Sequence, residues 1–321
     1  MSDLAPEILQ EALKEGLGDQ VFVNEPMARH TSFRIGGPAD LFVKAGTIEG
    51  LCRWVRLARR HAVPYFILGH GTNILVADRG IRGLVIQNDC QAYELREVEA
   101  GNAENFGGLS RTAILYAEGG ASLPGLAFLM ARMGWAGLEW AIGIPSSISS
   151  AVVNNAGAHG WSMADVLQRV TILTEEGEIA ELPVHQLALG YRTSRFKGQG
   201  GREVVLDAEF ALHREPVEVL TARMAQYADF RRRTQPSEPS VGSIFRNPPG
   251  DFAGRLIDQA GLKGRRVGQA EISPVHANFI VNHGGARAVD VQALIELARR
   301  TVWERFGVEL ELEIELVGEW G

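Results

Sequence analysis

Apolar residues recur along the chain at two spacings, one typical of strands and the other typical of helices. In the first 90 residues, apolar runs at 40–45, 65–68 and 81–87 predict strands. Thr47 is placed to cap a helix whose apolar residues return every three or four positions. A short amphipathic helix is also expected at 6–13. The chain therefore opens in a β-α-β order.

The middle of the chain has a different pattern, with more strands and fewer helices. Strands are expected at 113–118, 170–174 and 204–212. One helix is expected at 124–133, because Gly134 follows its last apolar residue and glycine commonly ends a helix.

The last third predicts helices at 217–233, 252–260 and 290–306, followed by a strand at 308–316. The Pro/Ser-rich stretch 235–240 resembles a linker, or it forms the wall of a site. Strict alternation in the final strand places four acidic residues on one face: Glu309, Glu311, Glu313 and Glu315. Four like charges on one face are typical of a sheet surface in water.

Together these elements predict an α+β protein of 321 residues, a length that suits two or three domains. The changes of pattern divide the chain into segments 1–90, 91–215 and 216–313. The last strand, 314–321, is expected to return to the first segment.

Composition narrows the class of function. The formal net charge of −7 argues against a general nucleic-acid binder, which needs a basic field. Cys52 and Cys90 are too few for a disulfide framework or a four-thiolate zinc site, and the scattered histidines predict no metal. The N-terminus lacks the pattern of a signal peptide, and no uncharged apolar run is long enough to span a membrane. An intracellular protein without membrane insertion is expected.

A glycine-rich turn follows the strand at 65–68. Residues 68–73 read Leu-Gly-His-Gly-Thr-Asn, in which successive backbone N–H groups can turn toward a phosphate. Residues 74–76 continue as strand rather than helix, so this is neither a Walker loop nor a GxGxxG fingerprint. A phosphate nest and an ordinary hairpin turn both fit the pattern.

A longer stretch of small residues lies at 137–160, where GLEWAIGIP is followed by SSISS and NNAGAHG. It is expected to be a long loop, and such loops are uncommon in compact domains unless they are functional. Small side chains let the backbone approach a flat or extended ligand, so ligand binding is the favoured interpretation over a plain Gly/Ser loop.

Two further motifs carry polar chemistry. Residues 190–197 gather Arg192, Arg195 and Lys197, and an arginine there could hold a carboxylate, although a solvated basic turn has the same pattern. Ser243 follows a glycine in VGSIFRNP without the context of a nucleophile elbow. A proton-donating serine and a turn serine both remain open.

Taken in this order, the motifs resemble the UDP-N-acetylenolpyruvoylglucosamine reductase family. The resemblance also includes HTSFRIGGPAD at 30–40, LGHGTNILVADRGIRG at 68–83, AGLKGRRVGQAEISPVHANFIVN at 260–282 and the closing LELEIELVG. It covers nearly the whole chain. Each motif is weak alone, and their joint spacing is specific.

The resemblance implies an FAD-binding module of the vanillyl-alcohol-oxidase type and a C-terminal α+β substrate-binding domain. It implies non-covalent FAD, with NADPH as co-substrate and UDP-N-acetylglucosamine enolpyruvate reduced to UDP-N-acetylmuramate for peptidoglycan. A bacterial cytoplasmic enzyme, monomeric or weakly oligomeric, is expected. Another FAD oxidoreductase of the same fold and a non-catalytic nucleotide-sugar binding protein are the alternatives.

The family's site residues carry over to matching positions. The catalytic residues implied are Arg192, Ser243 and Glu313. The substrate contacts implied are Tyr191, Asn247 and Gln235. The FAD contacts implied are Arg34, Gly69, His70, Gly71, Thr72, Asn73, Ile74, Gly143, Ile144, Pro145, Ser146, Ser150, Asn155, Ala156 and Gly157.

The chain departs from the family pattern at a few positions. Thr72 replaces a serine, and His159 stands where tyrosine is common. Ser146, Ser149 and Ser150 replace glycines, which adds side chains near the expected flavin. No extra loop follows Phe196, so the subtype without the tyrosine-bearing loop is expected.

Overall fold

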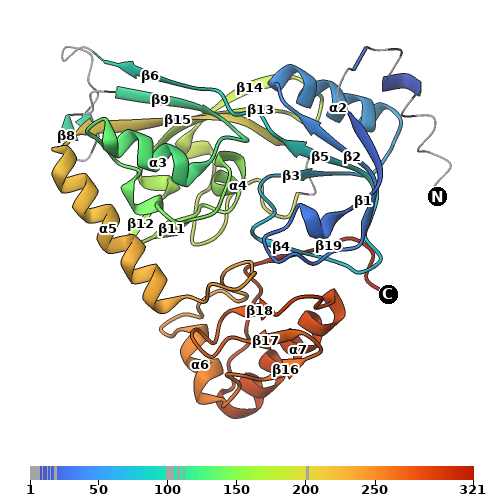
Figure 1. Cartoon of the computed structure of the whole chain (residues 1–321). Coiled ribbons are helices and arrows are strands. Elements are labelled where there is room, and N and C mark those ends of the chain that lie inside the picture. The colour runs from blue at the N-terminus through green and yellow to red at the C-terminus, as the bar shows by residue number, and fades with distance from the viewer. Residues whose placement is uncertain are drawn as a thin grey trace.

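The computed structural model describes residues 20–98, 113–199 and 202–321, with single positions between 8 and 17 and the strand backbone at 105–106 and 109–110. Of the helix expected at 6–13, residues 8, 10, 11 and 12 are described, and these four are helical; the other positions lie outside the described residues. The chain forms two lobes side by side and a third beneath them, which gives a triangular outline (Figure 1).

The first lobe is a sheet of order β1-β2-β5-β3 with helix α2 (Ile48–Arg60) on one face. Its strands are β1 (Val21–Pro26), β2 (Pro38–Ala45), β3 (Tyr65–Leu68) and β5 (Ile81–Asn88). Strand β5 lies parallel to both β2 and β3, while β1 is antiparallel to β2. Thr47 accepts a hydrogen bond from Gly50 N at 3.1 Å, which confirms the expected cap.

The end of the chain returns to this lobe. Strand β19 (Glu315–Val317) pairs in parallel with β4 (Ile74–Val76), directly after the glycine-rich turn. The expectation of one strand over 308–316 is wrong in extent. Before Glu315, the segment forms only a bridge between Leu312 and Phe245, because its neighbour there is an irregular loop.

The acidic side chains of this segment also differ in exposure, so one solvated face is a wrong description. The side chains of Glu309 and Glu311 are each 74% exposed, whereas that of Glu313 is 15% exposed.

The second lobe is an antiparallel sheet of order β14-β13-β15-β9-β6, with β10 (Trp135–Ala136) paired to β15. The remaining strands are β6 (Tyr93–Glu97), β9 (Ala113–Glu118), β13 (Leu167–Leu173), β14 (Ile179–Pro183) and β15 (Val204–Arg214). Helix α3 (Leu123–Arg132) packs into the core of this lobe with Trp135 and Trp140. The strands and helix expected here are confirmed.

The stretch at 137–160 is not the single loop that was expected. It contains a 3-10 turn (Glu139–Ala141), the helix α4 (Ile148–Val153) and the short strand β11 (Gly157–Ala158). Helix α4 forms because Ser147 caps it by accepting from Ser150 N, and its apolar side chains join the core of the lobe.

Helix α5 (Val217–Thr234) runs from the second lobe down to the third (Figure 1). The third lobe contains α6 (Ala253–Gln259), α7 (Ala288–Phe306) and a small sheet. The strands of that sheet are β16 (Arg266–Val267), β17 (Ala270–Ile272) and β18 (Ile280–Asn282). The expected helices are confirmed, each with its start within two residues and its end within one residue of the expectation. Phe33, Ile35 and Leu75 of the first lobe extend into the core of the third.

Candidate active site

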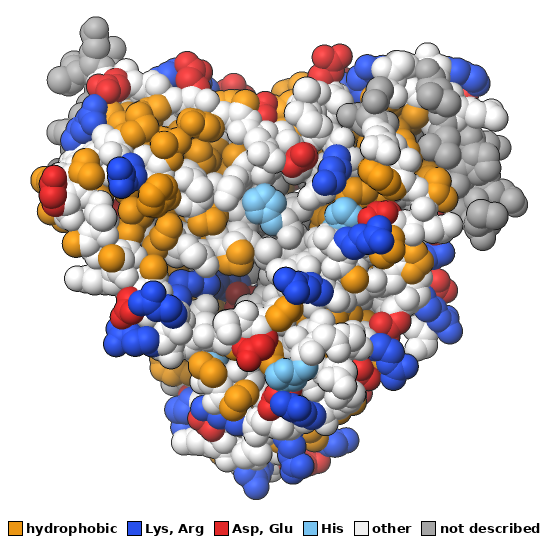
Figure 2. Space-filling model, in the orientation of Figure 1, with side chains coloured by type: hydrophobic (Ala, Val, Ile, Leu, Met, Phe, Trp, Pro, Cys, Tyr) orange, Lys and Arg blue, Asp and Glu red, His pale blue; other side chains and the backbone are white. Residues whose placement is uncertain are grey.

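A cavity of about 690 Å³ lies where the three lobes meet. Figure 2 shows a hollow in the middle of one face with basic side chains beside it. The cavity is lined by the turn after β3, by the start of α4, by the end of α5 and by the stretch that follows it. Its position at the junction lets separate segments contribute to one site.

The glycine-rich turn forms one wall. Among the described residues, the backbone N–H groups of 69–73 donate to no other part of the chain, and four of these five residues line the cavity. Gly71 has a φ of +63°, and a Cβ there would lie 2.0 Å from the carbonyl oxygen of His30. Free N–H groups on such a turn fit an anion such as a pyrophosphate, so the residues present suit the phosphates of FAD.

The serines of the α4 segment form a second wall. Gly143, Ile144, Pro145 and Ser146 line the cavity, as do Ser149 and Ser150. A Cβ on Gly69 would lie 2.3 Å from Ser150 Oγ and 2.5 Å from Ser147 Oγ, so the turn packs directly on these hydroxyls. Of the three serines at positions where glycine is common in the family, Ser150 is therefore accommodated by Gly69 opposite it.

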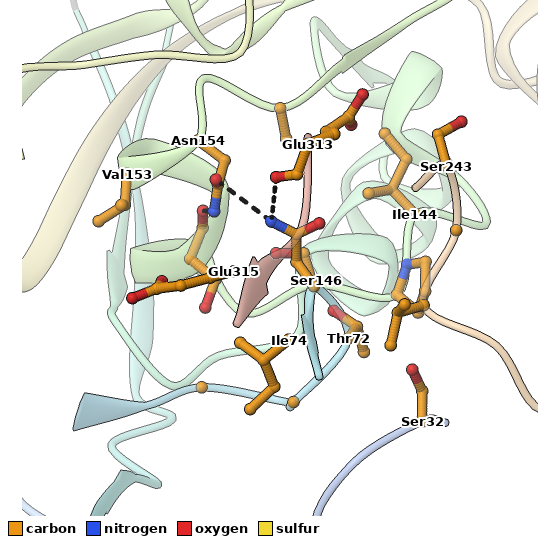
Figure 3. Close-up of a pocket in the computed structure, with 18 of the residues that line it drawn as sticks. Ser32, Thr72, Ile74, Ile144, Ser146, Val153, Asn154, Ser243, Glu313 and Glu315 are labelled. Carbon is orange, nitrogen blue, oxygen red and sulfur yellow. Dashed lines mark hydrogen bonds between the residues drawn. The ribbon is translucent and has the colours of Figure 1, made fainter. Parts of the chain in front are cut away.

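The Pro/Ser-rich stretch forms a third wall. Gln235, Pro236, Ser237 and Ser240 line the cavity, together with Arg231 and Arg232 from the end of α5. The stretch therefore forms part of a cavity wall, which favours the second of its two interpretations over a linker. Figure 3 shows Ser32, Thr72 and Ser243 among the polar side chains around the same cavity.

Arg192 and Glu313 meet at the cavity as an ion pair. The distance from Arg192 Nε to Glu313 Oε1 is 2.9 Å, and their side chains are 25% and 15% exposed. Burial raises the pKa of the Glu313 carboxyl, while the positive charges of Arg192, Lys197 and Arg246 act in the opposite direction. A proton is therefore held by Glu313 to higher pH than by an ordinary glutamate.

Ser243 lies on a fixed turn at the same cavity. It follows Gly242, whose φ is +79°, and Ile244 N donates to the carbonyl of Asn278 at 2.8 Å. The buried Asn278 side chain also holds Phe245, accepting from its N–H at 2.9 Å and donating to its carbonyl at 2.8 Å. Asn278 was not singled out from sequence, because nothing local indicates its partner.

Five expected contacts lie outside the lining of the cavity: Arg34, His70, Asn155, Tyr191 and Asn247. Arg34 is exposed, and His70 Nε2 lies 3.3 Å from the carbonyl oxygen of Gly120. Asn155 donates to the carbonyl of Gly190 at 2.8 Å, which places it behind the turn that carries Arg192.

Tyr191 and Asn247 contact each other instead. The side chain of Tyr191 is 58% exposed, and its hydroxyl accepts from Asn247 N at 3.3 Å. Asn247 Oδ1 accepts from Ala253 N at the start of α6. The other expected contacts, including Ala156, Gly157 and Gln235, line the cavity.

The remaining polar residues either line the cavity or form contacts within the chain. Arg195 forms a two-pronged pair with Glu203, at 2.7 and 3.0 Å, so it is engaged within the chain. His159 stacks on Tyr227 of α5 at 3.9 Å between ring centres. Lys197 and Asn154 line the cavity, although neither was predicted as a site residue.

The described part of the chain contains no group of acidic, histidine and cysteine side chains that could hold a metal ion. None of its helices is long and apolar enough to cross a membrane.

Comparison with known proteins identifies the family. A model for the C-terminal domain of UDP-N-acetylenolpyruvoylglucosamine reductase matches residues 235–317, and a model for an FAD-binding domain matches residues 39–183. The reductase of Chloroflexus aggregans is 45% identical over 308 residues, which is 95% of this chain and 100% of that protein. The chain belongs to the UDP-N-acetylenolpyruvoylglucosamine reductase family.

Other members of the reductase family agree over nearly the full length. The reductase of Bacillus velezensis is 41% identical over 313 residues, covering 97% of this chain and 98% of that protein. The crystal structure of the reductase from Thermus caldophilus superposes with a TM-score of 0.75 at 35% identity, over 93% of this chain and 98% of that one. The expected α+β fold, with an FAD-binding module and a reductase C-terminal domain, is confirmed.

Proposed function

We propose that Arg192, Ser243 and Glu313 act on the enolpyruvyl group of the substrate in the central cavity. The chain is an FAD-dependent reductase of UDP-N-acetylglucosamine enolpyruvate in peptidoglycan synthesis. The observation that carries the residue assignment is the partly buried Arg192–Glu313 pair at the cavity that also contains Ser243 and the turn at 69–73.

The nest at 69–73 and the serines of the α4 segment would hold FAD. The free N–H groups suit its pyrophosphate, and the hydroxyls of Ser146 and Ser150 offer further hydrogen bonds. When bound, FAD supplies hydride chemistry, with NADPH as the reductant. The protein positions and polarises the substrate.

Arg192 stabilises the negative charge that develops on the substrate. Adding hydride to the methylene carbon of an enolpyruvyl ether leaves charge on the neighbouring carbon and its carboxylate. A guanidinium fixed beside a half-buried carboxyl provides a preorganised cation for that charge. Ionised Glu313 orients Arg192, and protonated Glu313 adds a hydrogen-bond donor, a state that its raised pKa favours.

Ser243 delivers the proton that completes the reduction. Its hydroxyl lies on a turn that Asn278 holds in place, and it faces the cavity that also contains Arg192. A serine hydroxyl is a weak acid, so the transfer requires a strongly basic carbon, which the step before it creates.

We assign substrate contacts to Tyr191 and Asn247, which lie outside the cavity lining, and to Gln235, which is part of it. The Asn247 amide oxygen is engaged by Ala253 N, which leaves its amide N–H₂ group for substrate. We assign Arg231 and Arg232, which line the cavity, to the UDP phosphates.

We further propose the division into segments 1–90, 91–215 and 216–313. The pairing of β19 with β4 supports assigning 314–321 to the first segment. We also propose that the enzyme is monomeric or weakly oligomeric, works in the bacterial cytoplasm and belongs to the subtype without the tyrosine-bearing loop.

The visible spectrum of the purified protein tests the two half-reactions on which these residue roles depend. A yellow protein that bleaches with anaerobic NADPH and recovers its colour with UDP-N-acetylglucosamine enolpyruvate supports it. Bleaching without recovery would keep a flavin oxidoreductase but remove this substrate. A colourless protein that takes up no FAD would favour a non-catalytic nucleotide-sugar binder.

A further inference from the structure

A node of hydrogen bonds lies behind the Arg192–Glu313 pair. Lys197 Nζ is 2.9 Å from Asn154 Oδ1, 3.3 Å from the carbonyl oxygen of Arg192 and 3.5 Å from the carbonyl oxygen of Glu313. An ammonium group has three hydrogens to donate, so one side chain connects the end of α4 to both residues of the pair.

The phosphate nest reaches the same node. Asn73 Nδ2 lies 3.4 Å from Asn154 Oδ1 and 3.3 Å from the carbonyl oxygen of Glu313 (Figure 3). Asn154 Nδ2 donates to the carbonyl of Ser150 at 3.0 Å, which fixes the amide so that its oxygen faces both donors. Asn154 Oδ1 and the carbonyl oxygen of Glu313 each accept from both Lys197 and Asn73, so these two oxygens connect four segments that are distant in sequence.

Lys197 is an unusual residue to bury at this point. Its partners among the described residues are neutral oxygens rather than a carboxylate. Burial lowers the pKa of Lys197, as do Arg246 and Arg192, while Glu313 and Glu315 act in the opposite direction. A half-buried cation costs stability unless its hydrogen bonds compensate, and here three oxygens accept from the ammonium.

We propose that Lys197 is a positioning residue, whose ammonium fixes the backbone at Arg192 and Glu313 and so sets the geometry of that pair. Asn154 orients the ammonium and couples it to the nest through Asn73. This inference rests on the roles proposed above for Arg192 and Glu313. Arg246 Nη2 also donates to the Arg192 carbonyl, at 3.3 Å, and is a secondary support.

The same placement gives Lys197 an electrostatic effect on Glu313. The charged groups that face the Glu313 carboxyl are Arg192, Lys197 and Arg246, all of them cations that lower its pKa. Removing the Lys197 charge therefore raises the pKa of Glu313 further. If ionisation of Glu313 controls one limb of the pH–rate profile, that limb moves to higher pH in a variant without the Lys197 charge. A lysine that contributes only to folding stability would leave the limb in place.

The test compares Lys197→Met, Lys197→Arg and Asn154→Ala holoenzymes by stopped-flow measurement of the two half-reactions across pH. For Lys197→Met we expect flavin oxidation by substrate to slow at least about tenfold, because small misplacements of reacting groups are costly. Reduction by NADPH and FAD content should stay within about twofold of the starting protein. Lys197→Arg should keep the starting pH limb, and Asn154→Ala should slow the same half-reaction without moving that limb.

Lys44→Met is the matched control, since Lys44 is exposed on β2 and does not line the cavity. Arg192→Lys and Glu313→Gln separate the two proposals. If these slow substrate oxidation of the flavin but Lys197→Met changes neither its rate nor its pH limb, the positioning role is overturned. If neither slows it, the proposed function of the pair fails first. Should Lys197→Met not fold, unchanged substrate kinetics in Asn154→Ala would equally overturn the positioning role.

Discussion

At the scale of single residues, the site depends on a few side chains whose surroundings change their chemistry. Burial raises the pKa of Glu313, and the fixed turn at 242–245 presents Ser243 to the cavity. The same glutamate on an open strand face would be an ordinary surface carboxylate, as Glu309 and Glu311 are. Local chemistry is thus decided by the depth at which the backbone places each residue.

Ser243→Ala tests the proton-donor role. We expect the substrate half-reaction to fall by about 10²–10⁴-fold, the range for losing a positioned proton donor. Reduction of the flavin by NADPH should be nearly unchanged, since Ser243 has no part in it. Stopped-flow absorbance separates the two steps, and an equal loss in both would exclude the role.

Gly71→Ala tests the nest. The new Cβ would lie 2.0 Å from the His30 carbonyl oxygen on a backbone with φ of +63°, so the turn must move. We expect the purified variant to retain little FAD, measured by the absorbance ratio of flavin to protein. Gly46→Ala is the control, because its Cβ meets nothing within 4 Å; equal FAD content in both variants would contradict a phosphate role for this turn.

At the scale of elements, short helices are positioned by their caps and by their contact with the cavity wall. Ser147 is fully buried, caps α4 and touches Gly69 of the nest, so one hydroxyl serves the helix and the site. Ser122 caps α3 in the same way, accepting from Gly125 N at 3.3 Å, but it is not among the nearest neighbours of Gly69. Neither serine is among the residues that line the cavity.

Ser147→Ala and Ser122→Ala form a matched pair. Each loses a helix N-cap, so each should lower the free energy of unfolding by about 1 kcal/mol. Only Ser147→Ala should also weaken FAD binding, because α4 and the nest share that hydroxyl. Thermal melts give the stability, and fluorescence titration of the apoprotein gives the affinity. Equal affinities in the two variants would show that α4 is held independently of its cap.

At the scale of the whole molecule, the lobes share core residues rather than meeting only at their surfaces. Phe33 is fully buried and belongs to the first lobe by sequence, yet it packs in the core of the third lobe with α7. The returning strand β19 adds a second connection through β4. These contacts hold the cavity walls together, since each wall belongs to a different lobe.

Phe33→Ala tests this sharing. Emptying a buried phenylalanine site typically costs about 3–5 kcal/mol, and here the loss should reduce hydrogen-exchange protection in α6 and α7. Phe42→Ala removes an equally buried phenylalanine from the separate cluster inside the first lobe. We expect Phe42→Ala to leave hydrogen-exchange protection in the third lobe unchanged. Loss of protection in the third lobe with both variants would mean that the molecule unfolds as one unit.

The sequence by itself determined the features that depend on neighbours along the chain. Helix α2 follows from the Thr47 cap and an apolar repeat, and the turn at 69–73 follows from two glycines with a strand after them. The order of weak motifs was enough to indicate the reductase family. Helix α4 was missed because its Ser-rich start resembles a loop, and only contact with the core stabilises six residues as a helix.

Only the tertiary structure decided which distant residues meet. Strict alternation at 308–316 indicated a strand, but a strand needs a partner, and its neighbour is an irregular loop until β4 becomes available at Glu315. Lys197 and Asn154 lie 43 positions apart along the chain. In the folded chain, Lys197 donates to Asn154 Oδ1 and to the carbonyl oxygen of Glu313, and Asn73 Nδ2 donates to the same Asn154 oxygen. Hydrophobic periodicity records which side of an element is buried, whereas hydrogen bonds between lobes depend on how the elements pack.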